Sequence, residues 1–518
     1  MVKTDMQIAC DLAVVGSAFG GSLLALIARR LGLTVALIER DRHPRFAIGE
    51  SSTPLANLLL EELATRYGLP RLLPLCKWGP WQRAYPGIGC GLKRGFSFYH
   101  HRRGEAWAPT PARDNELLVA ASPNDEIADT QWYRPDFDHF LVAEARAAGV
   151  AYLDETNLGS VEFHGEGAAL AGIRQGREVR INARFVVDAS GPRGFLVRQL
   201  GLGERELPTF PPRQALFAHF RGVRTWEDTV GSQSGAPFPP DAAALHHVFD
   251  GGWMWVLRFN NGITSAGVSV SEALAAEINL AEGAPAWDRL VSLLPSVAAQ
   301  FAEASPIRPF IHAPRLAFRA GQLVGERWAL LPSAAGFVDP LFSTGFVLNL
   351  LGIERLAAAL GAGGVPDSAA LAHHAEETDA DWVAASRLLA AQHVTLGDPE
   401  RFNALTMLYF AAASFAETAR RLGRPTMDGF LLRRRPGFGS EALALADAVV
   451  ANPGLALPEL RRRVADLVGP INVAGLLNES KRNWYPCDAA DLLAAADKVP
   501  ATTDALREML RRVGFGLG

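Results

Sequence analysis

The chain has 518 residues, of which 49% are apolar and 20% are charged, and its formal net charge is −4. This is the composition of a globular protein large enough for two or three domains. The chain has no excess of basic residues that would attract the phosphates of nucleic acid, so we expect no nucleic-acid partner.

Several features predict a cytoplasmic protein without a membrane partner. The N-terminus lacks the charged, apolar and cleavage regions of a signal peptide. The longest apolar segments, residues 23–37 and 346–360, are interrupted by charged residues and are expected to be buried helices. The few cysteines lack metal or redox spacing, which indicates a reducing compartment; they are Cys10, Cys76, Cys90 and Cys487.

The first recognisable unit covers residues 12–39 and has the order strand, glycine turn, helix, strand, acid. The turn reads Gly16-Ser17-Ala18-Phe19-Gly20-Gly21. Glycines allow the tight turn and close packing of helix on strand, and the helix N-terminus offers free N–H groups to a pyrophosphate. Glu39 follows 19 residues after Gly20, where a carboxylate can accept from a ribose hydroxyl. The unit predicts a dinucleotide site, and its N-terminal position suits FAD at least as well as NAD.

Two later segments have weaker signals of their own. Ser51, Ser52 and Thr53 precede Pro54 and predict the start of a helix, whose amides could face an oxygen-rich ligand or could belong to an ordinary cap. Residues 96–101 alternate as in a strand, with Lys93 just before them. A lysine in such a place is most often solvated. The adjacent pair His100-His101 has no partner at metal-ligand spacing, so we expect no metal site.

The middle of the chain predicts the second half of a nucleotide-binding sheet and then a different sheet. Residues 150–153 and 185–188 are expected strands of the first. From about residue 205 to 300, short strands with glycine turns indicate an antiparallel sheet, the wall of a substrate cavity. Trp253 and Trp255 lie two residues apart and therefore on one strand face. Core packing is the simpler explanation of that pair.

A second platform for an anion or a flavin is expected in residues 332–345, where small residues lie between a strand and a helix. From about residue 366 onward the chain is predicted to be helical and to form a lid or support. The expected helices cover residues 369–390, 402–421, 441–450, 458–468 and 489–496.

Taken together, these segments resemble flavin-dependent halogenases, in particular those that act on phenols. The resemblance covers about residues 10–355. It is carried by residues 16–21, His43-Pro44-Arg45-Phe46 with Gly49-Glu50, Lys93 within Gly-Leu-Lys-Arg-Gly-Phe-Ser-Phe, Trp253-x-Trp255, and the run Phe337-Val338-Asp339-Pro340-Leu341-Phe342-Ser343-Thr344-Gly345.

The resemblance implies an α/β fold: a doubly wound FAD-binding domain like that of glutathione reductase and the flavin hydroxylases, an antiparallel substrate sheet and a C-terminal helical region. We expect an FAD-binding module over residues 1–355, with the substrate sheet inserted at about 85–125 and 205–300, and a helical domain over 356–518. The assembly is left open, and a homodimer is one form that the resemblance allows.

The resemblance also implies roles for individual residues. In that family reduced FAD, O₂ and chloride or bromide give hypohalous acid, which travels through a tunnel to a lysine that directs halogen onto an aromatic ring. The matching lysine is Lys93, and burial would lower its pKa in the direction that a neutral amine needs. Trp253 and Trp255 match the pair that keeps substrate from the flavin, and Thr344 with Gly345 match the halide site. FAD contacts are expected at Gly16, Ala18, Phe19, Gly20, Gly21, Glu39, Arg40, Gly49, Ser51, Arg134, Asp339 and Gly345.

Departures from the family pattern bear on affinity and substrate. Ala18 replaces a glycine and Pro332-Ser333 replaces a Gly-Asp, which suggests weak retention of the flavin. Arg258 replaces the proline after the tryptophan pair, which leaves local geometry and substrate charge open. Phe342 stands where tryptophan halogenases carry a glutamate, so a self-activating phenol is the expected substrate, held by a wall of Phe96, Phe98 and Phe342.

A separate flavin reductase is expected as partner, because no second glycine fingerprint for NAD(P)H is present. Two other functions stay open: a flavin-dependent aromatic hydroxylase that needs no halide, and a flavin-binding relative that has lost its chemistry. Lys93 and the tryptophan pair favour the halogenase, and Arg258 is the main feature against it.

Overall fold

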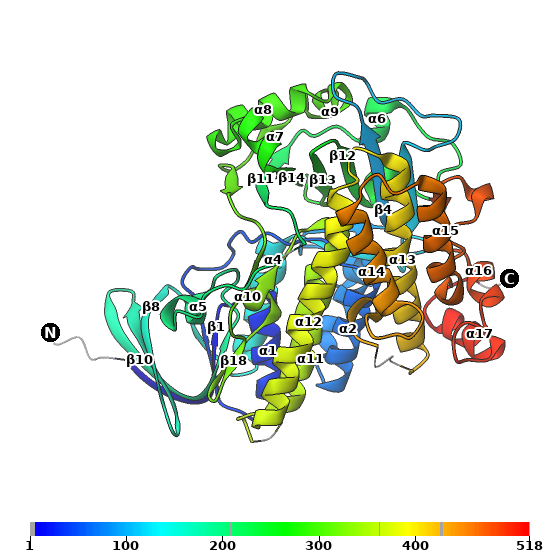
Figure 1. The fold of residues 1–518 in the computed structure, drawn as a ribbon. Helices are drawn as coiled ribbons and strands as arrows, with labels where there is room; N and C mark the ends of the chain where they lie inside the picture. Colours follow the sequence, from blue (N-terminus) through cyan, green and yellow to red (C-terminus); the bar gives the residue numbers. More distant parts are fainter. Residues whose placement is uncertain (1–5, 208, 362, 425–427, 517–518) are drawn as a thin grey trace.

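The computed structural model describes residues 6–207, 209–361, 363–424 and 428–516. Two sheets organise the molecule, and long helices pack along them (Figure 1). The first sheet has the order β18-β19-β10-β1-β2-β7, with the hairpin β8–β9 attached through β10. Its strands are β1 (Met6–Val15), β2 (Val35–Ile38), β7 (Ala151–Leu153), β8 (Thr156–His164), β9 (Gly167–Arg174), β10 (Arg177–Asp188), β18 (Val324–Gly325) and β19 (Trp328–Leu330).

The expected strand–helix–strand unit forms the centre of this sheet. β1 pairs in parallel with β2 and with β10, and α1 (Phe19–Arg30) connects β1 to β2. β2 is buried throughout, as expected for a parallel strand covered on both faces. A Cβ placed on Gly21 would lie 1.9 Å from the carbonyl oxygen of Gly16, so helix and strand pack this closely only with glycine there.

The second sheet has the order β15-β11-β14-β13-β12-β4-β5-β21, with β16 paired to β11. Neighbouring strands are antiparallel, apart from β12 with β4 and β5 with β21, which are parallel. The strands are β4 (Gly95–His101), β5 (Glu116–Ala120), β11 (Arg213–Arg221), β12 (Ala244–Phe249), β13 (Gly252–Arg258), β14 (Thr264–Ser271), β15 (Ser305–Pro306), β16 (Ile311–Ala313) and β21 (Trp484–Tyr485).

The expectation of strands up to residue 300 is wrong at its end. That part forms α7 (Glu272–Glu277), α8 (Ala284–Ser292) and α9 (Pro295–Phe301). Leu290 and Val297 on these helices are buried in the same apolar cluster as the outer face of the sheet. Amphipathic helices therefore cover this face.

The remaining helices and short strands surround the two sheets. They are α2 (Pro54–Arg66), α3 (Trp78–Ala84), β3 (Cys90–Lys93), β6 (Asp129–Trp132), α4 (Arg134–Ala147), α5 (Phe195–Gln199), α6 (Trp226–Val230), β17 (Phe318–Arg319), α10 (Pro332–Ala335), β20 (Gly336–Phe337), α11 (Thr344–Leu360), α12 (Ser368–His393), α13 (Pro399–Arg421), α14 (Gly439–Ala451), α15 (Leu457–Val468), α16 (Ala489–Ala494) and α17 (Thr503–Arg512). The five helices expected after residue 366 are present as α12 to α16, within a few residues of their expected ends.

The C-terminal helices are continuous with the rest of the fold. Residue 355, the expected domain boundary, lies inside α11, and α12 packs against α11. β21, from the C-terminal part, extends the second sheet through β5. The chain after residue 355 therefore completes the core around the second sheet.

Among the described residues, one apolar helix, Leu341–Leu360, is long enough to cross a membrane by length and composition. In this fold 67% of its most apolar stretch is buried, and it packs against α1, α2 and α12. The apolar side chains of this helix are therefore mostly buried in the core, as the sequence predicted for residues 346–360.

Candidate active site

The N-terminus of α1 forms a cradle of backbone N–H groups at the end of β1. Gly16 has φ +101°, a conformation that favours glycine, and a Cβ there would lie 2.5 Å from the carbonyl oxygen of Ala189. No side chain caps the helix, so the first-turn amides stay free for a ligand. Ala18 is the N-cap and is partly exposed at this end. These features fit the phosphates of a dinucleotide.

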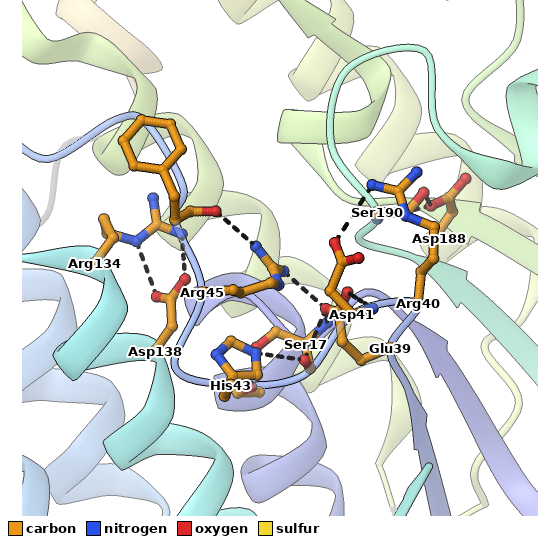
Figure 2. Close-up of polar contacts among 12 residues, drawn as sticks. Ser17, Glu39, Arg40, Asp41, His43, Arg45, Arg134, Asp138, Asp188 and Ser190 are labelled. Carbon is orange, nitrogen blue, oxygen red and sulfur yellow. Dashed lines mark hydrogen bonds and ion pairs between the residues drawn. The ribbon is translucent and has the colours of Figure 1, made fainter. Parts of the chain in front are cut away.

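Glu39 lies beside the cradle at the end of β2, and Ser17, Arg45 and Asp41 bind it (Figure 2). Its Oε2 accepts from Ser17 Oγ at 2.8 Å and from Arg45 at 2.7 Å, whereas Oε1 accepts, among the residues that the structure describes, only from the Asp41 amide. Burial opposes ionisation, but the charge of Arg45 and the hydrogen bonds hold the pKa of Glu39 below its usual range. The ionised Oε1 can accept a further hydrogen bond, and a ribose hydroxyl is a suitable donor.

Other residues expected to contact FAD also make contacts within the protein near the glycine turn and the loop at Gly49. Arg134 makes two hydrogen bonds to Asp138, at 2.8 and 2.9 Å (Figure 2). It also donates to the carbonyl oxygen of Gly49 at 2.8 Å. Arg134 therefore holds the loop at Gly49, whose φ is +88°. Phe19 is buried edge-on against Trp132, and Arg40 is exposed beside Asp41.

Asp339 connects the late loop, which we define as residues 338–343 before α11, to the second sheet. It accepts hydrogen bonds from Trp253 Nε1 at 3.2 Å, from Ser269 Oγ at 2.7 Å and from the Leu341 amide at 3.0 Å. Burial opposes its ionisation, but His393, 3.3 Å away, and these hydrogen bonds lower the pKa of Asp339. The carboxylate thus fixes where the loop leaves the sheet.

The loop then enters α11 through an unusual backbone. Phe342 and Ser343 have φ of +65° and +56°, a strained pair that marks functional turns in many proteins. α11 begins at Thr344, and a Cβ placed on Gly345 would meet nothing within 4 Å. The open space at Gly345, next to a long helix's N-terminal amides, fits a halide beside a flavin.

Lys93 lies at the end of β3 and is completely buried. Its Nζ donates to Ser51 Oγ at 2.7 Å and to the Ser52 carbonyl oxygen at 2.5 Å, and Ser343 Oγ is 3.4 Å away. Burial lowers the pKa of Lys93 from 10.5 to about 7, opposed by the charge of Asp129. Ser51, expected at the flavin, therefore binds the lysine.

Aromatic rings form a wall next to Lys93. Nζ lies 4.0 Å from the ring centre of Phe96, which stacks with Phe98, and Phe342 meets Phe98 edge-on. The structure thus brings together all three rings that the sequence predicted for this wall.

The two tryptophans lie next to each other on β13, with ring centres 5.7 Å apart. Trp253 contacts His246, whose ring stacks on Phe98 at 4.5 Å. Through its bond to Asp339, Trp253 also touches the late loop. Trp253 therefore contacts both the loop and, through His246, the aromatic wall, whereas Trp255 donates to Ser265 and packs near Phe217.

Comparison with known proteins identifies the family. A model of the tryptophan halogenase family matches residues 131–397, just over half of the chain. The chain belongs to this family. The similarity to flavin-dependent halogenases expected from the motifs is confirmed.

Two curated relatives are named as halogenases of different compounds. The chain is 30% identical to monodechloroaminopyrrolnitrin halogenase PrnC of Pseudomonas fluorescens over 68% of this chain, and 31% identical to tetracycline 7-halogenase of Kitasatospora aureofaciens over 67%. The matched regions span 61% and 63% of those two enzymes.

Solved structures confirm the fold. Halogenase PltM in complex with phloroglucinol and FAD superposes with a TM-score of 0.80 at 24% identity, covering 91% of this chain and 99% of that one. The flavin-dependent brominase Bmp2 gives a TM-score of 0.62 at 20% identity, covering 86% and 99%. The expected α/β fold with its flavin-binding domain is therefore that of flavin-dependent halogenases.

Arg258, the residue that replaces the family's proline, has a structural role here. Its Nε donates to Asp241 at 2.6 Å, and its Nη atoms donate to the carbonyl oxygens of Val223 and Arg224. These bonds attach the β11–β12 connection to the end of β13. Each of the three guanidinium nitrogens of Arg258 therefore has a hydrogen-bond partner within the protein.

The sequence missed several residues of the wall. Tyr409 on α13 stacks on Phe342 with ring centres 4.5 Å apart and donates to its carbonyl oxygen at 2.8 Å. Phe410 meets Phe96 edge-on at 5.3 Å. The alternation of apolar residues in this helix predicts burial but does not show which element they contact. No cluster of three or more metal-ligating side chains is present in the described part of the chain.

Proposed function

We propose that the protein is an FAD-dependent halogenase that uses reduced FAD, O₂ and chloride or bromide to halogenate a phenolic or other electron-rich aromatic ring. The observation that carries the proposal is Lys93, a completely buried amine beside an aromatic wall. FAD would be held by Gly16, Gly20, Gly21, the amides of Ala18 and Phe19, and Glu39, with Arg40 at the rim and Gly345 on the other side.

When bound and reduced, FAD supplies with O₂ the two-electron oxidation of halide to hypohalous acid. The amides of Thr344 and Gly345 would hold the halide. Trp253 and Trp255 would exclude the aromatic substrate from the flavin, so that hypohalous acid alone passes between them and the late loop.

The two shortest contacts of Lys93 can be made by a neutral amine. A neutral Nζ has two N–H groups, and its two shortest contacts, Ser51 Oγ and the Ser52 carbonyl, take both. The lone pair is then left to accept a hydrogen bond from hypohalous acid or to carry the halogen. Because burial brings the pKa of Lys93 to about 7, much of the amine is neutral near pH 7.

The substrate must activate its own ring, because Phe342 offers no carboxylate at the position where tryptophan halogenases have one. A phenol meets this need, since its hydroxyl donates electron density to the ring. Planar rings would pack against Phe96, Phe98 and Phe342, each good aromatic pair contributing about 0.5–1.5 kcal/mol. The phloroglucinol complex of the structurally similar PltM supports this substrate class.

A separate flavin reductase would supply the reduced cofactor, and we place the enzyme in the cytoplasm. The test is mass spectrometry of phenols, indoles and pyrroles incubated with the protein, FAD, a reductase, NADH and each halide. We expect halogenated phenols that disappear without halide or without the protein. A hydroxylated product formed equally well without halide would instead identify a flavin hydroxylase, and no product with any ring would indicate a flavin-binding relative.

A further inference from the structure

A cavity of about 140 Å³ leads away from the aromatic wall between α13, α2 and the C-terminal segment. One water needs about 10–15 Å³ on this scale, so the cavity is about ten times larger than a single water site. Its wall includes Phe96 and Phe410 at one end and Glu417 and Arg421 further along α13. Most of the other lining side chains are apolar.

The length of the cavity follows from its two helices. Phe410 and Arg421 are 11 residues apart on α13, about 16 Å at 1.5 Å per residue. α2 begins beside Lys93, which binds the Ser52 carbonyl, and α2 meets α13 again where Glu62 pairs with Arg420. Both helices therefore run from the lysine toward Arg421, and a single phenol ring at Lys93 would leave the far part of the cavity unfilled.

Arg421 is a charged group built into this apolar cavity. Its side chain is only 9% exposed, and its Nε donates to Glu417 Oε1 at 2.7 Å. Neither of its terminal amino groups has a hydrogen-bond partner among the residues that the structure describes. A guanidinium has five N–H donors and no acceptor, so the four donors on the terminal amino groups remain available to a ligand.

We infer that Arg421 is a specificity residue that binds a carbonyl or carboxylate oxygen at the far end of an elongated aromatic substrate whose reacting ring lies at Lys93. Glu417 binds Nε and leaves the two terminal amino groups of this cavity-lining arginine available to a ligand; such a fork matches a carboxylate or carbonyl oxygen. The inference rests on the proposed function for the identity of the reacting ring. It adds that single-ring phenols are poorer ligands than phenols with a polar tail.

Binding to the flavin-free protein tests this without turnover. The probes are 4-hydroxyphenyl alkanoic acids of increasing chain length and the matched 4-alkylphenols, with Kd measured by calorimetry. For the wild type we expect the acid to bind more tightly than its alkylphenol only once the chain is long enough to reach Arg421. The double variant Arg421→Gln/Glu417→Gln, which keeps the pair neutral, should weaken the long acid by about tenfold or more and leave the alkylphenol unchanged.

Controls separate this effect from misfolding and from failure of the proposed function. Arg424→Gln, which removes an exposed arginine three residues further on, should change neither Kd. Arg421→Lys keeps the charge without the fork and should lose part of the acid's advantage. Equal Kd values for acid and alkylphenol at every length in the wild type, or an equal loss for both in the variant, would overturn the inference even if the protein halogenates phenols. A selective loss would support it even if no halogenation is found.

Discussion

Replacing Lys93 by Met should change how the stability of the protein depends on pH. Lys93 is completely buried, and its pKa falls from 10.5 to about 7 through desolvation. Each pKa unit is worth 1.36 kcal/mol, so the difference corresponds to about 5 kcal/mol as an upper bound. Between pH 7 and 10.5 the unfolded chain holds a proton on this lysine that the folded protein has lost, so the wild type gains stability as pH rises.

The Met variant has no titrating group at this position and lacks that gain. The stability of the variant relative to the wild type should therefore be highest at pH 7 and below, and should fall by up to several kcal/mol toward pH 10. Denaturant unfolding of both proteins at matched pH values measures this difference. Lys93→Gln should give the same slope with a different offset. A difference that stays constant from pH 6.5 to 9.5 would refute the low pKa, because an ordinary lysine stays protonated over that range.

Three further outcomes are expected. Purified protein should be largely colourless and take up added FAD reversibly, and Gly21→Ala should abolish that uptake, because its Cβ would collide with Gly16; a stoichiometric yellow protein that survives dialysis would contradict weak binding. Without an added reductase, NADH and FAD should give almost no reduced flavin in an absorbance assay, and rapid reduction by the protein alone would exclude a two-component system. In a competition assay, resorcinol-like rings should be halogenated much faster than free tryptophan because Phe342 carries no carboxylate; a preference for tryptophan would refute that reasoning.

The sequence predicted those parts of the site that depend on local chain geometry. The turn from Gly16 to Gly21 folds as expected: Gly21 allows close packing on Gly16 within the strand–helix–strand unit, and Gly16 packs against Ala189 after β10. Lys93 and the tryptophan pair were found through the motifs that contain them. The tryptophan pair lies on β13 of the second sheet, whereas Lys93 lies on β3, which pairs with β6 in a separate two-stranded sheet.

The surroundings of these residues could not be read from the sequence, because distant segments supply them. Lys93 binds Ser51 and approaches Ser343, which are 42 and 250 residues away in the chain. Tyr409 extends the aromatic wall from α13. The apolar pattern of that helix predicts that one face is buried but does not identify the segment against which it packs. Arg134, which was predicted to contact FAD, also binds Asp138 and the carbonyl oxygen of Gly49, partners that the sequence did not show.

The most direct test of the central claim is product formation by Lys93→Ala. The variant is assayed with FAD, a reductase, halide and a phenol, while FAD affinity and release of hypohalous acid to a chemical trap are measured in parallel. Among the described residues, the printed contacts of Lys93 Nζ are with Ser51, Ser52, Ser343 and the Phe96 ring and none is with the glycine turn, so FAD binding and trapped hypohalous acid should persist while the halogenated phenol falls to the level that free hypohalite gives. Halogenated phenol well above that level would remove Lys93 from the reaction and contradict the proposed function of this site.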